Sequence, residues 1–368
     1  MNTAGDMVAP GDMDSATNTM METDLNSVDK NKQDREDKVN DLSSLEPVKI
    51  NIIWGIVLFF VVGHLSAIYG LYLAFTSTSL LTTLFGLFSW ILSGLGVTAG
   101  LHRLWSHKSY KAKWPLRFIL MLMSTMAFEN HIYEWCMDHR IHHKYTDTNS
   151  DPHNAKRGFF FSHVGWLVVR RHPDYYDKCL KIDMSDLKKD SIVMFQKTFY
   201  VPLLLLFCFI LPTIIPVYFW NETYVNAFFT TMLRYIFTLN MTWLVNSAAH
   251  IWGKRPYDAS INPSENLSVS LGALGEGWHN YHHVFPWDYK AAELGNYRAN
   301  LTTAFIDFFS LIGWAYDMKT VSNDMILKRA NRTGDGSHPN GDGIWGWDDS
   351  NISIEDRKLT TVINKKDD

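Results

Sequence analysis

The sequence predicts an all-α integral membrane protein in which four transmembrane helices form two hairpins below a helical cap on the cytosolic side. Three observations predict this fold. Four long apolar segments carry almost no charge, they occur as two closely spaced pairs, and a charged, histidine-rich stretch follows each pair. About 20 apolar residues suffice to cross a hydrocarbon core that is about 30 Å thick. The expected spans are residues 52–75, 80–101, 199–220 and 226–248.

The first pair of apolar segments contains no charged residue. The segment from Ile52 to Phe75 has about 24 residues and would extend about 36 Å as a helix, which is enough to cross a bilayer. A short polar break from Thr76 to Ser79 separates it from the segment 80–101, whose glycines permit close contact between helices. The two segments are therefore expected to form a hairpin.

The second pair includes residues that a soluble helix would disfavour. Segment 199–220 contains Pro202, Pro212 and Pro216, which membrane helices tolerate when the freed carbonyl groups find other partners. Segment 226–248 contains Arg234 as its only charged residue. Both segments are long enough to span, so a second hairpin is expected.

The distribution of charge sets the expected orientation. Most Lys and Arg residues lie in 102–198 and 249–335, whereas the breaks within the two hairpins carry none, so the positive-inside rule makes these long segments and both termini cytosolic. The N-terminal residues are polar with little apolar periodicity. The expected organisation is a disordered tail over 1–48, one domain over 49–335 and a polar tail over 336–368.

Charge and cysteine content exclude several classes of protein. The formal net charge of -4 indicates no basic surface for a nucleic-acid partner. Cys136, Cys179 and Cys208 form no CxxC pair, which argues against a disulfide framework and against a thiolate metal site.

Three groups of histidines stand out among the 15 in the chain. They occur as HRLWSH, HRIHH and HNYHH, all on the expected cytosolic side. Residues i, i+3 and i+4 of a helix share one face, so each HxxHH pattern presents three rings in one direction. The candidate ligands are His102, His107, His139, His142, His143, His279, His282 and His283, and His250 after the fourth span could supply a ninth imidazole.

HNYHH by itself could be either a metal site or a polar loop at the membrane surface. The presence of three histidine groups favours metal binding. Eight imidazoles exceed the four ligands of one zinc ion, so two metal ions fit the pattern better. Imidazole suits Fe, Cu, Ni and Zn, and a nitrogen-rich site at the mouth of a membrane bundle suits a redox-active iron with room for oxygen. The other histidines lack ligand spacing and are expected to be ordinary polar residues, among them His131, His153, His163, His172 and His338.

Several motifs resemble those of the membrane fatty acyl-CoA desaturases of animals, particularly the insect branch. They are HRLWSH, DHRIHHKYTDTNSDPHN, RGFFFSHVGW, WLVNSAAH and GEGWHNYHHVFPWDY, and the resemblance runs from about Ile52 to Gly336. It implies a four-span protein of the endoplasmic reticulum with two non-haem iron ions (Fe²⁺). Such enzymes act on a fatty acyl-CoA, using O₂ and two electrons from cytochrome b5 and its NADH-dependent reductase to insert one cis double bond.

The resemblance also implies roles for individual residues. The iron ligands would be His102, His107, His139, His142, His143, His250, His279, His282 and His283, with Asn246 acting through a water molecule. Trp135 and Thr242 would lie at the bend of an acyl tunnel, and Trp90 and Gly94 at its closed end. Further substrate contacts would come from Asn130, Asp138, Arg170 and Arg171.

The sequence departs from the family pattern where the CoA headgroup would bind. Gly55 and Ile56 stand where a cationic and a polar residue are usual, Met137 replaces an arginine, and Glu129 stands where many relatives have glutamine. The segment 262–265 ends in Glu, which is typical of Δ9 enzymes rather than Δ11 enzymes. The resemblance therefore favours a Δ9 desaturase of unsaturated fatty acid synthesis, with pheromone or cuticular-lipid precursors as one use of its products.

Two other functions are compatible with the same motifs. A di-iron fatty acyl hydroxylase would use the same oxidant but return a hydroxyl group, and product analysis separates an alcohol from an alkene. An inactive membrane scaffold would keep the fold, but it predicts an incomplete ligand set, and none of the nine histidine positions is lost.

Overall fold

The computed structural model describes residues 50–293, 297, 299–339 and 354–361. The expected N-terminal tail, 1–48, lies outside these residues, as does much of the expected C-terminal tail, 336–368.

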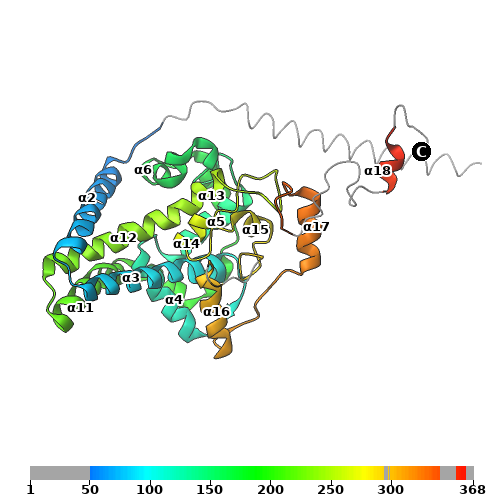
Figure 1. Cartoon of the computed structure of the whole chain (residues 1–368). Helices are drawn as coiled ribbons and strands as arrows, with labels where there is room; N and C mark the ends of the chain where they lie inside the picture. Colours follow the sequence, from blue (N-terminus) through cyan, green and yellow to red (C-terminus); the bar gives the residue numbers. More distant parts are fainter. Residues whose placement is uncertain (1–49, 294–296, 298, 340–353, 362–368) are drawn as a thin grey trace, which may run out of the picture. The chain divides into compact units, whose positions relative to one another are not determined.

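Long apolar helices occupy the segments that the sequence predicts as spans (Figure 1). Helix α2 covers Trp54–Thr76, and α3 covers Leu80–Leu95 and continues as the π-helix η1, Gly96–Ser106. The third long helix consists of α10 (Tyr200–Leu204), η4 (Leu205–Ile210) and α11 (Leu211–Trp220). In the described part of the chain, the helices Trp54–Thr76, Leu80–Ser106 and Tyr200–Trp220 are long and apolar enough to cross a membrane.

Helix α12, Tyr224–Asn246, occupies the fourth expected span but is less apolar than the other three. It packs against α2, α3 and α11 (Figure 1). The polar side chains that lower its hydropathy face this packing surface and are buried: Asn226, Thr230, Thr231, Arg234 and Thr238. A fourth span therefore remains a proposal, supported by the length and packing of α12.

Arg234 compensates for a proline in the neighbouring long helix. Pro212 has no N–H group, so the carbonyl of Cys208, four residues earlier, lacks its usual helical partner. Arg234 donates one hydrogen bond to the Cys208 carbonyl at 2.6 Å and another to the Met126 carbonyl at 2.5 Å. Arg234, the only charged residue in an apolar segment, thus donates hydrogen bonds to carbonyl groups that water could not reach within a membrane.

Glu222 joins the two expected hairpins at their turns. Its carboxylate accepts hydrogen bonds from the Ser79 N–H at 3.0 Å and the Thr82 hydroxyl at 2.8 Å, both at the start of α3. It also accepts from the Asn226 amide at 2.9 Å, on α12. The polar breaks 76–79 and 221–225 are therefore held together by one buried side chain.

Shorter helices occur in the rest of the described chain. They are α4 (Trp114–Ala127), α5 (Ile132–Lys144), η2 (Ala155–Arg157), η3 (Phe161–Gly165), α6 (Trp166–Val168), α7 (Pro173–Cys179), α8 (Ser185–Lys189), α9 (Ser191–Thr198), α13 (Ala248–Ile251), α14 (Leu267–Gly272), α15 (His279–Val284), α16 (Leu301–Leu311), α17 (Asn323–Thr333) and α18 (Ile354–Leu359). The fold is not purely helical, because β1 (Lys111–Ala112) pairs antiparallel with β2 (Ala315–Tyr316). This small sheet joins the segment before α4 to the segment after α16.

The second span is longer than the sequence predicts, because its helix does not end at Leu101. It continues to Ser106 as η1, and the His107 N–H donates to the His102 carbonyl, five residues earlier. A π-helix places residues i and i+5 next to each other, and such segments are frequent at functional sites. The His102 and His107 rings consequently lie 4.9 Å apart between centroids.

Candidate metal centre

Four helical segments bring the clustered histidines together at the C-terminal ends of α3 and α12. Helix η1 carries His102, His107 follows its last residue, and α13 carries His250. Both HxxHH patterns form helices, α5 and α15, as the sequence predicts. The rings fall into two groups whose ligand atoms lie within 4.8 Å of one another: His102, His107, His139, His143 and His282 in group 1, and His142, His250, His279 and His283 in group 2.

The ring nitrogens in each group point toward a common centre. In group 1 the Nε2–Nε2 distances are 2.7 Å for His107 and His139, 2.9 Å for His102 and His282, and 3.0 Å for His143 and His282. In group 2, Nε2 of His279 lies 3.0 Å from that of His250 and 3.1 Å from that of His283. A neutral imidazole has one donor and one acceptor nitrogen, so converging Nε2 atoms cannot all satisfy one another. A shared cation satisfies all of them.

The protonation state of the rings fits this arrangement. Burial, with repulsion from neighbouring imidazolium groups as a second cause, holds the pKa well below 6.5 at His107, His139, His143, His250, His279, His282 and His283. The rings are therefore neutral at pH 7, and a neutral ring nitrogen is the form that binds a metal ion.

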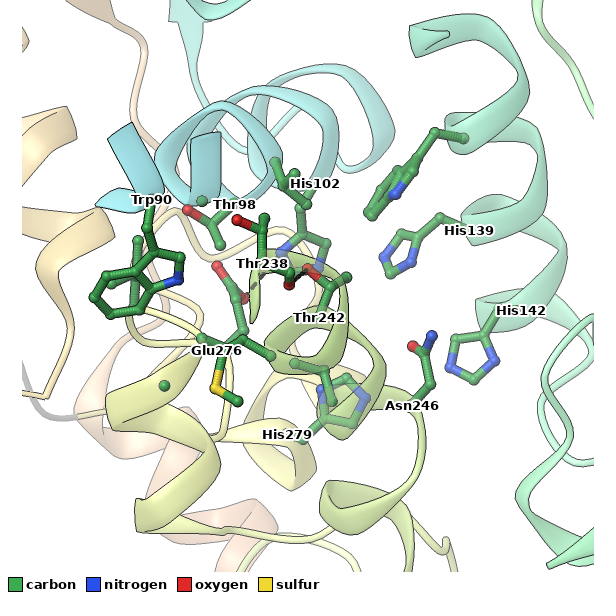
Figure 2. A pocket seen from close by; sticks show the side chains of 18 residues that line it. Trp90, Thr98, His102, His139, His142, Thr238, Thr242, Asn246, Glu276 and His279 are labelled. Carbon is green, nitrogen blue, oxygen red and sulfur yellow. Dashed lines mark hydrogen bonds and ion pairs between the residues drawn. The ribbon is translucent and has the colours of Figure 1, made fainter. Parts of the chain in front are cut away.

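A narrow cavity of about 50 Å³ extends from the histidines toward α3 (Figure 2). In Figure 2 Trp90 lies on one side of this space, and His139 and His142 lie on the other. The lining also includes His102, His279, Gly94, Trp135, Thr242 and Asn246. Thr238 and Met241 of α12 and Leu274 complete much of the wall. We call this space the inner cavity.

A second cavity of about 640 Å³, the outer cavity, meets the inner one at shared residues. Trp135, His139, Thr242 and Asn246 line both. The remaining residues that the sequence predicts as substrate contacts line the outer cavity only: Asn130, Asp138, Arg170 and Arg171. The structure thus brings every predicted substrate residue to one of two adjoining spaces beside the histidines.

The charged residues of the outer cavity are partly paired with each other. Both guanidinium NH groups of Arg171 donate to the Asp138 carboxylate, at 2.7 and 2.6 Å, and the Tyr175 hydroxyl donates to it as well. Arg170 is exposed on the rim. Arg170 is therefore better placed than Arg171 to meet an anionic group without first losing a carboxylate partner.

A family model and the similar proteins of known name indicate the same family for this chain. Residues 74–300 match the family model for fatty acid desaturase. The chain is 63% identical over 322 residues to an acyl-CoA Delta-9 desaturase of Acheta domesticus, covering 87% of this chain and 89% of the relative. The chain belongs to the fatty acid desaturase family. It is also 56% identical, over the same number of residues and with the same coverage of both chains, to an acyl-CoA Delta12-desaturase of Acheta domesticus. Identity to stearoyl-CoA desaturase 2 of Mus musculus is 54% over 296 residues, or 80% of this chain and 82% of the relative.

Two carboxylates orient histidines in this desaturase-family site. Both lie within motifs that carry the family resemblance, but their spacing does not indicate this role. Glu276 places Oε2 at 2.9 Å from Nδ1 of His102, and its other oxygen lies 2.8 Å from Arg103. Asp151 places Oδ1 at 2.9 Å from Nδ1 of His142. A carboxylate on Nδ1 directs the lone pair of Nε2 outward, which is the usual support for a metal-bound histidine.

His153 is the one histidine that the sequence assigns to an ordinary role but that lies beside the site. Its Nδ1 is 3.5 Å from Asp151 Oδ1, and its ring centroid is 4.3 Å from that of His142. The nearby carboxylate in the DPHN stretch is the only sequence signal that points to it.

Glu129 connects two residues at the junction of the cavities. Its carboxyl group accepts hydrogen bonds from Trp135 Nε1 at 3.2 Å and from the Thr242 hydroxyl at 2.8 Å. Burial raises the pKa of Glu129 from its usual 4.5 to about 7, although both hydrogen bonds act in the opposite direction. A glutamine could accept only one of these two bonds through its oxygen.

We expect Asp151→Asn to weaken metal binding by about 10-fold to 100-fold, because the His142 ring loses its carboxylate support. Metal content after dialysis against chelators of increasing strength measures this effect. The matched control is Asp147→Asn, since the Asp147 side chain bonds Asn262 and no histidine. Equal metal retention in the two variants would contradict the role of Asp151.

The raised pKa of Glu129 predicts a pH-dependent stability. Between about pH 4.5 and pH 7 the folded protein holds a proton that the unfolded chain has lost, so stability falls as pH rises through this window. Tm is measured in detergent at pH 5.5 and at pH 7.5. The decrease in Tm between these two pH values should be larger in the wild type than in Glu129→Gln. Asp324→Asn, on an exposed part of α17, should behave as the wild type does. An unchanged pH dependence in Glu129→Gln would show that Glu129 is not responsible.

Proposed function

We propose that this protein is an acyl-CoA desaturase that inserts one cis double bond into a fatty acyl-CoA. The observation that carries the proposal is the pair of histidine groups at the junction of two cavities. The names of the relatives agree with it, because they include acyl-CoA desaturases of insects and a stearoyl-CoA desaturase of mouse.

The metal ions in this proposal are two non-haem irons. The nitrogen-only donor set, with no thiolate, suits a redox-active iron. Group 1 would hold one ion and group 2 the other, and Asn246, which lies beside His142 and His279 in the cavity wall, would act through a water molecule (Figure 2). Together with O₂ and two electrons, bound iron supplies the oxidant that an unactivated methylene C–H bond requires and that no side chain provides.

The protein residues position the chain and exclude water. The inner cavity would take the methyl end of the acyl chain, and Trp135 and Thr242 would form the passage that presents one pair of carbons to the histidine groups. Glu129 holds this passage by bonding both residues. Position decides the product, since a displacement of about 1 Å can cost on the order of 100-fold in rate.

The outer cavity is the proposed place of the CoA group. Arg170 supplies positive charge on its rim, and Asn130, Asp138 and Arg171 supply polar groups on its wall. Gly55 has no Cβ atom to contribute, and Ile56, which lines the cavity, adds only apolar surface. We therefore propose that headgroup binding relies on the α6–α7 side more than on the start of α2.

For the position of the double bond we propose Δ9. The support is the 63% identity to a Delta-9 enzyme, against 56% for a Delta-12 enzyme of the same insect and 55% for a Delta-11 enzyme of Spodoptera littoralis. The Glu that ends the segment 262–265 agrees with this choice. Its carboxylate accepts from the backbone N–H of Tyr281, within the third histidine motif, at 2.8 Å.

We further propose a multi-pass location in the endoplasmic reticulum membrane, with both termini in the cytosol. Electrons would come from cytochrome b5 and its NADH-dependent reductase. The support is the placement of the histidine groups at the ends of the apolar helices that the positive-inside rule assigns to the cytosol.

Expression in desaturase-deficient yeast tests the activity directly. We expect growth without added unsaturated fatty acid, and gas chromatography should find a new double bond mainly at Δ9. His282→Ala should abolish product, whereas Trp287→Ala, a half-exposed neighbour, should retain most of it. Hydroxylated product instead of an alkene, or no product from protein that has bound iron, would refute the proposal.

Gly94 provides a test of the inner cavity. A Cβ atom at Gly94 would lie 2.7 Å from Leu274 Cδ1, so a larger side chain must displace Leu274 or fill the cavity. We expect Gly94→Leu to shift the product profile toward shorter acyl chains. Gly55→Leu is the control, because nothing lies within 4 Å of a Cβ atom at Gly55. The same chain-length profile in both variants would contradict the assignment of the closed end.

A further inference from the structure

Helix α16 exposes an apolar face that no sequence pattern above assigns. Leu301, Phe308 and Leu311 lie on one side of the helix, and they are 38%, 56% and 87% exposed. The opposite side is buried through Thr302, Thr303 and Ile306. A one-sided apolar helix of this kind either meets a partner or lies at a membrane surface.

The depth of α16 along the second span identifies what covers this face. Helix α16 packs against η1, and the hydroxyl groups of Thr302 and Thr98 are 2.7 Å apart. Thr98 lies about 27 Å along the helix that begins at Leu80, at a rise of about 1.5 Å per residue. The hydrocarbon core is about 30 Å thick, so the start of α16 is level with its cytosolic edge.

The apolar face of α16 is also continuous with other lipid-facing surface. Lys113 N–H donates to the Trp314 carbonyl at 2.9 Å, which places the start of α4 beside the end of α16. Trp114 of α4 is 67% exposed there, next to the exposed Lys113. Tryptophan with lysine beside it is typical of the level where lipid headgroups begin.

We propose that α16 is a membrane-surface helix whose Phe308, Leu311 and adjacent Ile312 insert into the cytosolic leaflet of the bilayer that the spans cross. Trp114 and Lys113 border the same contact at headgroup level. The proposal concerns a lipid surface and rests on the membrane placement of the spans, not on the reaction.

This contact reaches the wall of the inner cavity. The Thr302 hydroxyl, on the buried side of α16, also donates to the Leu274 carbonyl at 2.8 Å, and both Thr98 and Leu274 line the cavity. The lipid-facing and cavity-facing sides of α16 are thus one helix width apart, so the leaflet supports the wall against which the acyl chain is proposed to lie.

Fluorescence from single labelled cysteines tests the proposal in the full-length protein. Cys179→Ser removes the partly exposed native thiol, since Cys136 and Cys208 are buried. An environment-sensitive dye on Leu311→Cys is compared with dyes on Leu87→Cys, an exposed apolar site on α3, and on Lys328→Cys, an exposed site on α17. Each protein is reconstituted in bilayers with and without brominated acyl chains, and iron content reports correct folding.

We expect the dye at position 311 to show a blue-shifted emission and a loss of intensity in brominated lipid comparable to position 87, with neither effect at position 328. Emission at 311 that matches 328 would overturn the proposal, because the face would then be in water. A blue shift without quenching by bromine would also overturn it, because a protein surface or a second copy would then cover the face. If the dye at position 87 shows neither the blue shift nor quenching by bromine, the membrane placement of α3 is contradicted instead. Ile312→Cys replaces Leu311→Cys if the latter loses iron.

Discussion

The convergence of nine imidazoles on two points is the constraint on which the rest of this structure depends. Such an arrangement is unfavourable by itself, because lone pairs face one another at about 3 Å and burial removes the water that would separate them. Two bound cations would remove this repulsion, because each would accept the lone pairs that face one another. The surrounding protein can be understood as a scaffold that holds the rings in place before the ions arrive.

The long apolar helices lead directly to the histidine groups. Helix η1 extends the second span, and His250 follows α12 directly, so the bundle sets the positions of His102, His107 and His250. The bundle in turn depends on polar contacts that lipid cannot replace. Arg234 satisfies the Cys208 carbonyl freed by Pro212, and Glu222 holds the two turns together. Polar residues within apolar segments are therefore structural here.

Much of this arrangement could be predicted from the sequence, because local patterns encode it. Apolar runs predicted the bounds of the first and third long helices to within two residues and the start of the second, and the HxxHH spacing predicted three rings on one face of α5 and of α15. Features that depend on tertiary contact could not be predicted. One such feature is the close packing of η1 against α4, because a Cβ atom at Gly96 would lie 2.2 Å from the Ser124 backbone nitrogen. Glu276 and Asp151 support histidines that are far away or in no recognisable spacing.

The continuity of α3 with η1 has a consequence for the size of substrate. Gly94 at the far wall of the inner cavity and His102 beside the metal groups belong to one uninterrupted helix, eight residues or about 12 Å apart. The backbone of this continuous helix fixes the distance between the two residues. Movements of loops cannot lengthen this helix. If the acyl chain lies in the inner cavity as proposed, the space beyond the metal groups changes only when a side chain in its wall is replaced.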